Sequence, residues 1–308
     1  MGVKLHTDDR QFYVSPQNKG AYSSDRFARL QHSYNQHSMF SWDAIRELAE
    51  FMYPLKGCRF VKRGLNLDSE FYHVSESPDG RSLKQIFDEI EQPGSWIALY
   101  NIEKHPDYAK LLNSIVGPLS DLFKDQEGDF FNVGGFMFIS APPAYTPYHM
   151  DRENNFWLQL KGQKRLGLFE RSDRTILSET QIEDFIVNRS LDSIALTDEI
   201  AAKAEYFDVK AGEGVYFPST TPHMTETTSG WEKPGDGVSV SLGVPFYTQQ
   251  TRYIAQLCQY NKVARRLHLP LSKLDTPRGK ESIKAALGRY VALTKKNYRH
   301  YNPPPGSY

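Results

Sequence analysis

Near the middle of the chain the sequence reads Thr146-Pro147-Tyr148-His149-Met150-Asp151, with two possible metal ligands two residues apart. Side chains alternate between the faces of a β-strand, so His149 and Asp151 would point the same way. An imidazole and a carboxylate on one face are two of the three ligands in the facial triad that holds non-haem Fe(II). The segment therefore predicts a strand that carries part of an iron site.

The third ligand should be a histidine from a distant strand, and His223 is the candidate. It follows a segment that reads as turn, strand and turn: Gly212-Glu213-Gly214-Val215-Tyr216-Phe217-Pro218. A His-x-Asp pair alone is common in proteins without a metal. The distal histidine after an apolar strand is what favours a triad.

A lysine follows shortly after the first two ligands. The run from Phe156 to Phe169 is divided by a turn signal at Gly162-Gln163, and Lys164 then shares a strand face with Leu166 and Leu168. A lysine in an apolar interior is costly unless an anion meets it. No acidic residue lies on its own strand face, so a bound carboxylate would serve. The alternative is that Lys164 lies at a strand end and reaches water.

These residues form the pattern Thr-x-x-His-x-Asp-x-x-x-Asn-Phe, followed by Lys-Gly-x-Lys-Arg. The pattern resembles the JmjC-type, cupin-like 2-oxoglutarate oxygenases, and among them the asparaginyl hydroxylase of hypoxia-inducible factor. The match is dense over 146–169, fair over 207–242 and weak over 1–100. It implies a mainly β fold, a double-stranded β-helix (jelly-roll) core with N-terminal and C-terminal helical additions.

The resemblance also implies roles for individual residues. Fe(II) would be bound by His149, Asp151 and His223, and no catalytic residue beyond these ligands is implied. Thr146 and Lys164 would bind the far carboxylate of the cosubstrate 2-oxoglutarate.

Two further residues are placed near the cosubstrate by the same resemblance. Asn155 matches the family's asparagine there, and Tyr100 matches a frequent tyrosine, although Tyr100 could instead be plain core. The family's second asparagine has no counterpart here, because the strand after the distal histidine reads Ser241-Leu242-Gly243-Val244-Pro245.

Composition limits the other function classes. The 308 residues carry 37 basic and 37 acidic side chains, and this balance argues against a broad nucleic-acid surface. No apolar run is long enough for a membrane span, and the N-terminus lacks a secretory signal. Cys58 and Cys258 are far apart and form no Cys-x-x-Cys motif. We therefore expect a cytoplasmic protein, in a reducing compartment that suits ferrous iron.

Periodicity and capping signals predict the remaining elements. Residues 1–40 are expected either to wrap the barrel or to be partly mobile. Helices are expected over 42–52, 83–90, 107–116, 178–187 and 197–206. A further helix is expected to begin at Pro118. Strands are expected over 58–61, 96–100, 132–140, 209–217, 224–228 and 238–242. Residues 1–250 would form the oxygenase domain.

Residues 251–308 would form a helical extension, with helices over 251–267 and 279–297. Either these helices fold back on the barrel, or they pair with those of a second chain. The asparaginyl hydroxylase of the resembling family dimerises through such a pair, which favours a homodimer.

The favoured function is an enzyme that hydroxylates a C–H bond of a protein side chain or a peptide-like small molecule, with release of succinate and CO2. The alternatives are a non-catalytic cupin-like binding or regulatory protein and a JmjC-type lysine demethylase. Retention of all three ligands together with Thr146 and Lys164 favours the enzyme. Trp231, in a loop, could touch the substrate or anchor the loop.

Overall fold

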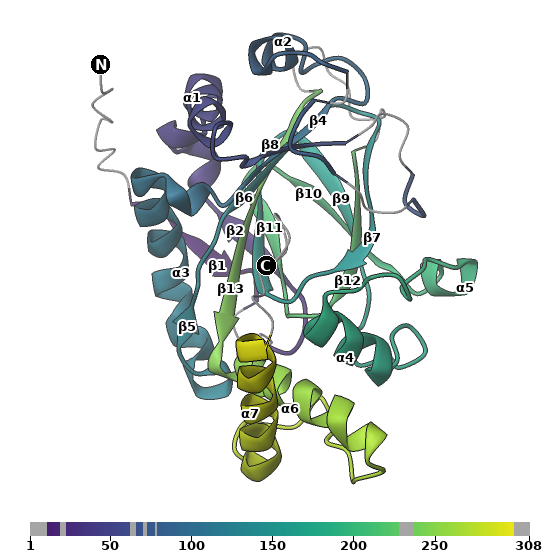
Figure 1. Cartoon of the computed structure of the whole chain (residues 1–308). Helices are drawn as coiled ribbons and strands as arrows, with labels where there is room; N and C mark the ends of the chain where they lie inside the picture. Colours follow the sequence, from purple (N-terminus) through teal and green to yellow (C-terminus); the bar gives the residue numbers. More distant parts are fainter. Residues whose placement is uncertain are drawn as a thin grey trace.

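The computed structural model describes residues 11–18, 23–61, 66–69, 73–77, 79–227 and 237–298. Trp231 lies outside these ranges. Two antiparallel sheets face each other, as Figure 1 shows. The large sheet has the order β1-β2-β11-β8-β13-β6-β4-β3, with β5 beside β13, and the small sheet has the order β10-β9-β12-β7. This is the predicted jelly-roll core.

The strands of the large sheet are β1 (Val14–Pro16), β2 (Ala28–His32), β3 (Cys58–Phe60), β4 (Trp96–Tyr100), β5 (Phe130–Phe131), β6 (Phe136–Ser140), β8 (Asn154–Lys161), β11 (Glu213–Phe217) and β13 (Ser239–Thr248). The small sheet consists of β7 (Ala144–Met150), β9 (Gln163–Leu168), β10 (Glu205–Lys210) and β12 (Pro222–Thr227). The predicted wrapping of the N-terminal segment is seen in β1 and β2, which extend the large sheet beyond β11.

The seven α-helices of the described ranges are α1 (Trp42–Met52), α2 (Leu83–Asp88), α3 (Pro106–Glu127), α4 (Glu179–Asn188), α5 (Asp198–Ala201), α6 (Gln249–Arg266) and α7 (Ser282–Tyr298). Helices α1 and α3 cover the outer face of the large sheet, where their apolar side chains join those of β8 and β13 in one core. Helices α4 and α6 contribute to a second core against the outer face of the small sheet. In the described part of the chain, no helix is both long and apolar enough to cross a membrane.

The turn at Gly162 joins two strands, as predicted, but the strands enter different sheets. Strand β8 pairs with β11 and β13, whereas β9 pairs with β10 and β12. Gly162 has a φ of +63°, and a Cβ there would lie 2.7 Å from the carbonyl oxygen of Val238. Only glycine suits this sharp crossing. As a result Leu158 packs under the helices, whereas Lys164 and Leu166 face the space between the sheets.

The prediction that a new helix begins at Pro118 was wrong, because α3 continues through it to Glu127. An internal proline costs a helix about 3 kcal/mol or more. Leu119 and Phe123, which follow it, are almost fully buried against the sheet. Each such burial contributes roughly 1.5–3 kcal/mol, so packing offsets the proline.

The predicted helix over 197–206 was too long. Thr197 caps α5, which ends at Ala201, and Tyr206 belongs to β10. Along β10, Phe207 and Val209 are buried while their neighbours are exposed, a period of two. Pairing with β9 along the whole strand stabilises this conformation.

The two C-terminal helices differ in how they are covered. Helix α6 packs on α4, where Glu183 accepts hydrogen bonds from Arg265 and Asn261. Helix α7 lies close to α6, since a Cβ on Gly288 would be 1.8 Å from the carbonyl oxygen of Gln256. The outer side of α7 leaves Ile283 and Leu287 exposed. The division at residue 250 stays a prediction.

Candidate metal centre

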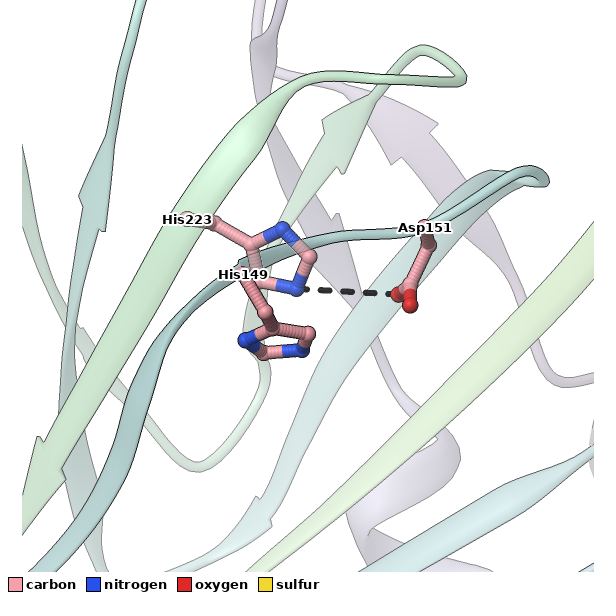
Figure 2. Close-up of side chains that lie close together, drawn as sticks. All are labelled: His149, Asp151 and His223. Carbon is pink, nitrogen blue, oxygen red and sulfur yellow. Dashed lines mark ion pairs between the residues drawn. The ribbon is translucent and has the colours of Figure 1, made fainter. Parts of the chain in front are cut away.

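The three predicted ligands converge at one end of the small sheet. Strands β7 and β12 pair so that His149 lies opposite His223, and Asp151 follows the end of β7. One ligand atom from each residue lies within 4.8 Å of the others. The Nε2 atom of His223 is 3.6 Å from Oδ2 of Asp151, and Figure 2 shows the three side chains pointing toward one another.

Backbone carbonyls fix which nitrogen of each imidazole is available. Nδ1 of His149 lies 2.7 Å from the carbonyl oxygen of Pro147, and Nδ1 of His223 lies 3.0 Å from that of Thr221. A carbonyl only accepts, so each Nδ1 must donate its proton. Both Nε2 atoms then keep a lone pair for a metal, and the carbonyls orient the rings.

Burial sets the charge of the three groups. It lowers the pKa of His149 to about 4 and that of His223 to about 4, so both rings are neutral at physiological pH. Burial also raises the pKa of the Asp151 carboxyl, against the effect of His149. Two neutral nitrogens and one carboxylate form a donor set that fits a divalent cation of the first transition row.

A tight turn over 218–221 ties the two halves of the centre together. The backbone N–H of Thr220 donates to the carbonyl of Asp151 at 2.8 Å, and the hydroxyl of Ser219 donates to the carbonyl of Arg152 at 2.8 Å. The backbone N–H of Ser219 donates to Oδ1 of Asn154, also at 2.8 Å. Thr220 adopts a φ of +62°, which a β-branched residue rarely does. The surrounding hydrogen bonds hold this conformation, which keeps the Asp151 segment next to the strand of His223.

We expect Asn154→Ala to weaken metal binding by about 10- to 100-fold, as loss of a residue that supports a ligand does. The change removes the acceptor of the Ser219 N–H and loosens the Asp151 segment from the turn. Calorimetric titration of the apoprotein with Co(II) measures the affinity. The matched control is Asn113→Ala, on the exposed side of α3. An affinity equal to that of the wild type would show that Asp151 is held without this contact.

The ligands open onto a cavity of about 250 Å³. Its walls come from both sheets and from α4, and they include aromatic side chains and every cosubstrate residue that the sequence suggested: Tyr100, Phe136, Phe138, Thr146, Asn155, Trp157, Lys164 and Phe217. All the predicted site residues therefore lie around one space.

Lys164 is the most informative of these residues. Its side chain is only 2 % exposed, and it faces the cavity that holds the ligands. Burial lowers the pKa of Lys164 to about 7, and no carboxylate of the described residues offsets this effect. The alternative that Lys164 reaches water at a strand end is wrong. A buried ammonium of this kind calls for an anionic ligand.

The other cosubstrate residues surround Lys164 and the ligands. Thr146 is buried on β7, opposite Thr225 of β12. Asn155 is buried, and its Oδ1 makes no hydrogen bond within the described residues. A Cβ on Gly243 would lie 3.4 Å from the Asn155 amide nitrogen, so the Asn155 side chain lies directly against this glycine.

Tyr100 lies in the cavity wall, and its ring centroid is 4.7 Å from that of Phe136. Sequence reasoning missed five polar members of the wall: His73, Arg152, Glu153, Arg189 and Thr225. Arg152 and Glu153 directly follow Asp151 and could have been suspected from that neighbourhood. His73 and Arg189 come from distant segments that no motif marks.

The sequence matches no family model and no curated protein. Solved structures of similar architecture include Escherichia coli YcfD, with 14% identity over 94% of this chain and 67% of that chain, and a TM-score of 0.47. Another is E. coli YcfD, described as a ribosomal oxygenase, in complex with cobalt and 2-oxoglutarate (16% identity, 94% and 64% coverage, TM-score 0.41). A third is SnoK, a non-heme alpha-ketoglutarate-dependent carbocyclase from nogalamycin biosynthesis (15% identity, 75% and 86% coverage, TM-score 0.44). This chain thus spans about two thirds of the length of YcfD, and the likeness is one of backbone architecture.

Proposed function

We propose that this protein is an Fe(II)- and 2-oxoglutarate-dependent oxygenase that hydroxylates a C–H bond of a protein side chain or a peptide-like small molecule. The observation that carries the proposal is one cavity that contains both a His-Asp-His ligand set and a buried lysine without an acidic partner among the described residues. The His-Asp-His set suits iron, and the lysine suits the far carboxylate of the cosubstrate.

Both atoms of O2 are accounted for in the proposed reaction. One atom of O2 enters the substrate C–H bond as a hydroxyl, and the other enters the succinate that forms as 2-oxoglutarate loses CO2. Iron supplies the redox chemistry for these steps when it is bound.

The protein's own residues would bind and orient the metal and the cosubstrate. His149, Asp151 and His223 would hold the metal on one side and leave positions open on the other. Lys164 and Thr146 would bind the far carboxylate of 2-oxoglutarate, with Asn155 beside them. Aromatic side chains in the wall would exclude water around the bound cosubstrate, which would strengthen each of these electrostatic contacts.

The direct test is turnover of 2-oxoglutarate by iron-loaded protein in air, measured as succinate. We expect succinate to form slowly without any substrate and to require iron. No succinate from protein that has bound iron and 2-oxoglutarate would favour the non-catalytic binding protein. Formaldehyde released from methylated lysine peptides would instead indicate the demethylase.

We also propose a cytoplasmic homodimer that forms through the C-terminal helices. The supporting observation is the outer side of α7, where Ile283 is 80 % exposed, Leu287 51 % and Tyr290 67 %. These residues are spaced at i, i+4 and i+7, so they form one apolar stripe. A stripe of this kind on a surface helix suits a two-fold contact with its own copy.

We expect Ile283→Arg combined with Leu287→Arg to halve the mass measured by light scattering. Both side chains are exposed in one chain, so the fold tolerates the change, whereas a two-fold interface would bring like charges together at a cost of several kcal/mol. Leu122→Arg, on α3 and 45 % exposed, is the control, since it lies outside the C-terminal helices. A wild-type protein that scatters as a monomer at micromolar concentration would contradict the dimer.

A further inference from the structure

Two arginines, Arg152 and Arg189, stand in the wall of the metal cavity. Both are half-buried, in contrast to the fully buried Lys164, His149 and His223 in the same wall. Part of each arginine therefore reaches solvent, and this part of the wall is called the entrance.

The backbone holds both arginines in place. Arg152 follows the ligand Asp151, and its carbonyl accepts the hydroxyl hydrogen bond of Ser219. Arg189 ends α4 in a left-handed conformation with a φ of +62°, and its N–H donates to the carbonyl of Phe185, which also lines the cavity. Hydrogen bonds thus fix the backbone of each arginine, Arg152 in the bend between β7 and β8 and Arg189 at the end of α4.

The charges of the cavity leave a positive surplus at this entrance. With cofactors bound, the charges of Fe(II) and Lys164 would balance those of Asp151 and the 2-oxoglutarate dianion. Of the remaining charged side chains among the described residues of the wall, Arg152 and Arg189 are cations and Glu153 is an anion. Glu153 also accepts a hydrogen bond from the hydroxyl of Tyr247, which directs its carboxylate toward β13. An anionic substrate would complement this entrance.

A side groove of about 190 Å³ adjoins the metal cavity and shares Arg152 with it. Its wall includes a stack in which the guanidinium of Arg252 lies 3.9 Å from the ring centroid of Phe131, and Phe131 stacks on Tyr247 at 5.8 Å. The hydroxyl of Tyr247 in the side groove donates a hydrogen bond to Glu153 in the metal cavity. The groove and the cavity therefore share a wall. Two adjoining spaces suit an extended chain better than a single small metabolite.

The size of the positive region favours a peptide over a nucleic acid. Nucleic-acid binding rests on about 6–10 phosphate contacts from lysines and arginines. Here three arginines line the two spaces, and the whole chain has no net charge. Three arginines are enough to bind one or two carboxylates of a peptide.

Resting on the proposed function, we infer that the substrate is a peptide segment with an acidic residue close to the hydroxylated position, and that Arg152 and Arg189 bind its carboxylate. The side groove receives the continuing peptide chain along Phe131, Tyr247 and Arg252. These arginines are substrate-binding residues that select for charge.

The test uses three pools of N-acetylated nonapeptide amides with a randomised central residue. The pools differ only at the two positions that lie two residues before and two residues after the central one. Both positions carry Glu in the first pool, Gln in the second and Lys in the third. The measured quantity is the rise in succinate formation, with the mass gain of one oxygen atom in the peptide. We expect the Glu pool to exceed the Lys pool by on the order of tenfold or more, as a charge-assisted hydrogen bond would give.

Reversing the charge of both arginines distinguishes a role in substrate recognition from a role in the stability of the fold. We expect Arg152→Glu combined with Arg189→Glu to shift the preference to the Lys pool, which a merely structural role would not do. Arg266→Glu, on the exposed end of α6, is the control and should keep the Glu preference. A wild type that prefers Lys, shows no preference or responds to no pool overturns the inference, as does an unchanged preference in the double variant.

Three further outcomes are informative. A 12-nucleotide oligouridine that stimulates succinate formation more than the Glu pool would overturn the peptide assignment in favour of RNA. A wild type that binds neither Co(II) nor 2-oxoglutarate would contradict the proposed function itself. A wild type that binds both and lacks the acidic preference would contradict this inference alone.

Discussion

His149→Ala is expected to abolish metal binding while most of the fold remains. The change leaves one imidazole and one carboxylate, and it should lower the affinity by well over the roughly 10- to 100-fold that loss of a mere supporting residue costs. His149 is neutral, and the pairing of β7 with β12 runs through the backbone, so the change removes neither a charge nor a strand contact. Calorimetric titration with Co(II) measures the affinity, and circular dichroism reports the fold.

The control for this change is His268→Ala, since His268 is exposed at the end of α6. It should bind metal as the wild type does. If the His149 variant still bound one equivalent with similar affinity, the metal site would have to lie elsewhere.

Lys164→Met is expected to raise the dissociation constant of 2-oxoglutarate by about ten- to a hundred-fold, because a hydrogen bond to a charged partner contributes roughly 1.5–3 kcal/mol. Methionine fills the same buried space without charge, so the variant should fold. Lys161→Met is the matched control, since Lys161 ends β8 outside the cavity. An unchanged dissociation constant would show that the anion is bound elsewhere.

The pH dependence gives a second measurement on the same lysine. Its pKa of about 7 means that the ammonium is present below pH 7 and is lost above it. Only the ammonium attracts the carboxylate, so the affinity for 2-oxoglutarate should fall as pH rises, by up to about tenfold per pH unit. The Lys164→Met variant should lack this dependence.

The local pattern of the sequence predicted the centre of the fold well. His149 at the end of β7 and Asp151 directly after it point to one site, because the alternation of side chains is a local property, and His223 on β12 pairs beside them. The helix caps at Ser41 and Ser82 were also correct, since one side chain and one nearby N–H determine each of them.

Tertiary packing decided what the sequence did not predict. The proline of α3 was overridden by burial of Phe123 against the sheet, a contact between distant segments. The strands that flank Gly162 separated into two sheets because each pairs with strands far along the chain. Arg189 reached the cavity only through the placement of α4 on the barrel, which no motif reports.

The central claim is that one cavity binds a divalent metal and 2-oxoglutarate together. The most direct measurement is calorimetric titration of 2-oxoglutarate into the anaerobic protein, with and without Co(II) as a redox-stable substitute for Fe(II). We expect one 2-oxoglutarate per chain and an affinity that is much higher with metal, because the metal and Lys164 would bind opposite ends of the same molecule. Binding that is absent, or equally tight with and without metal, would contradict it.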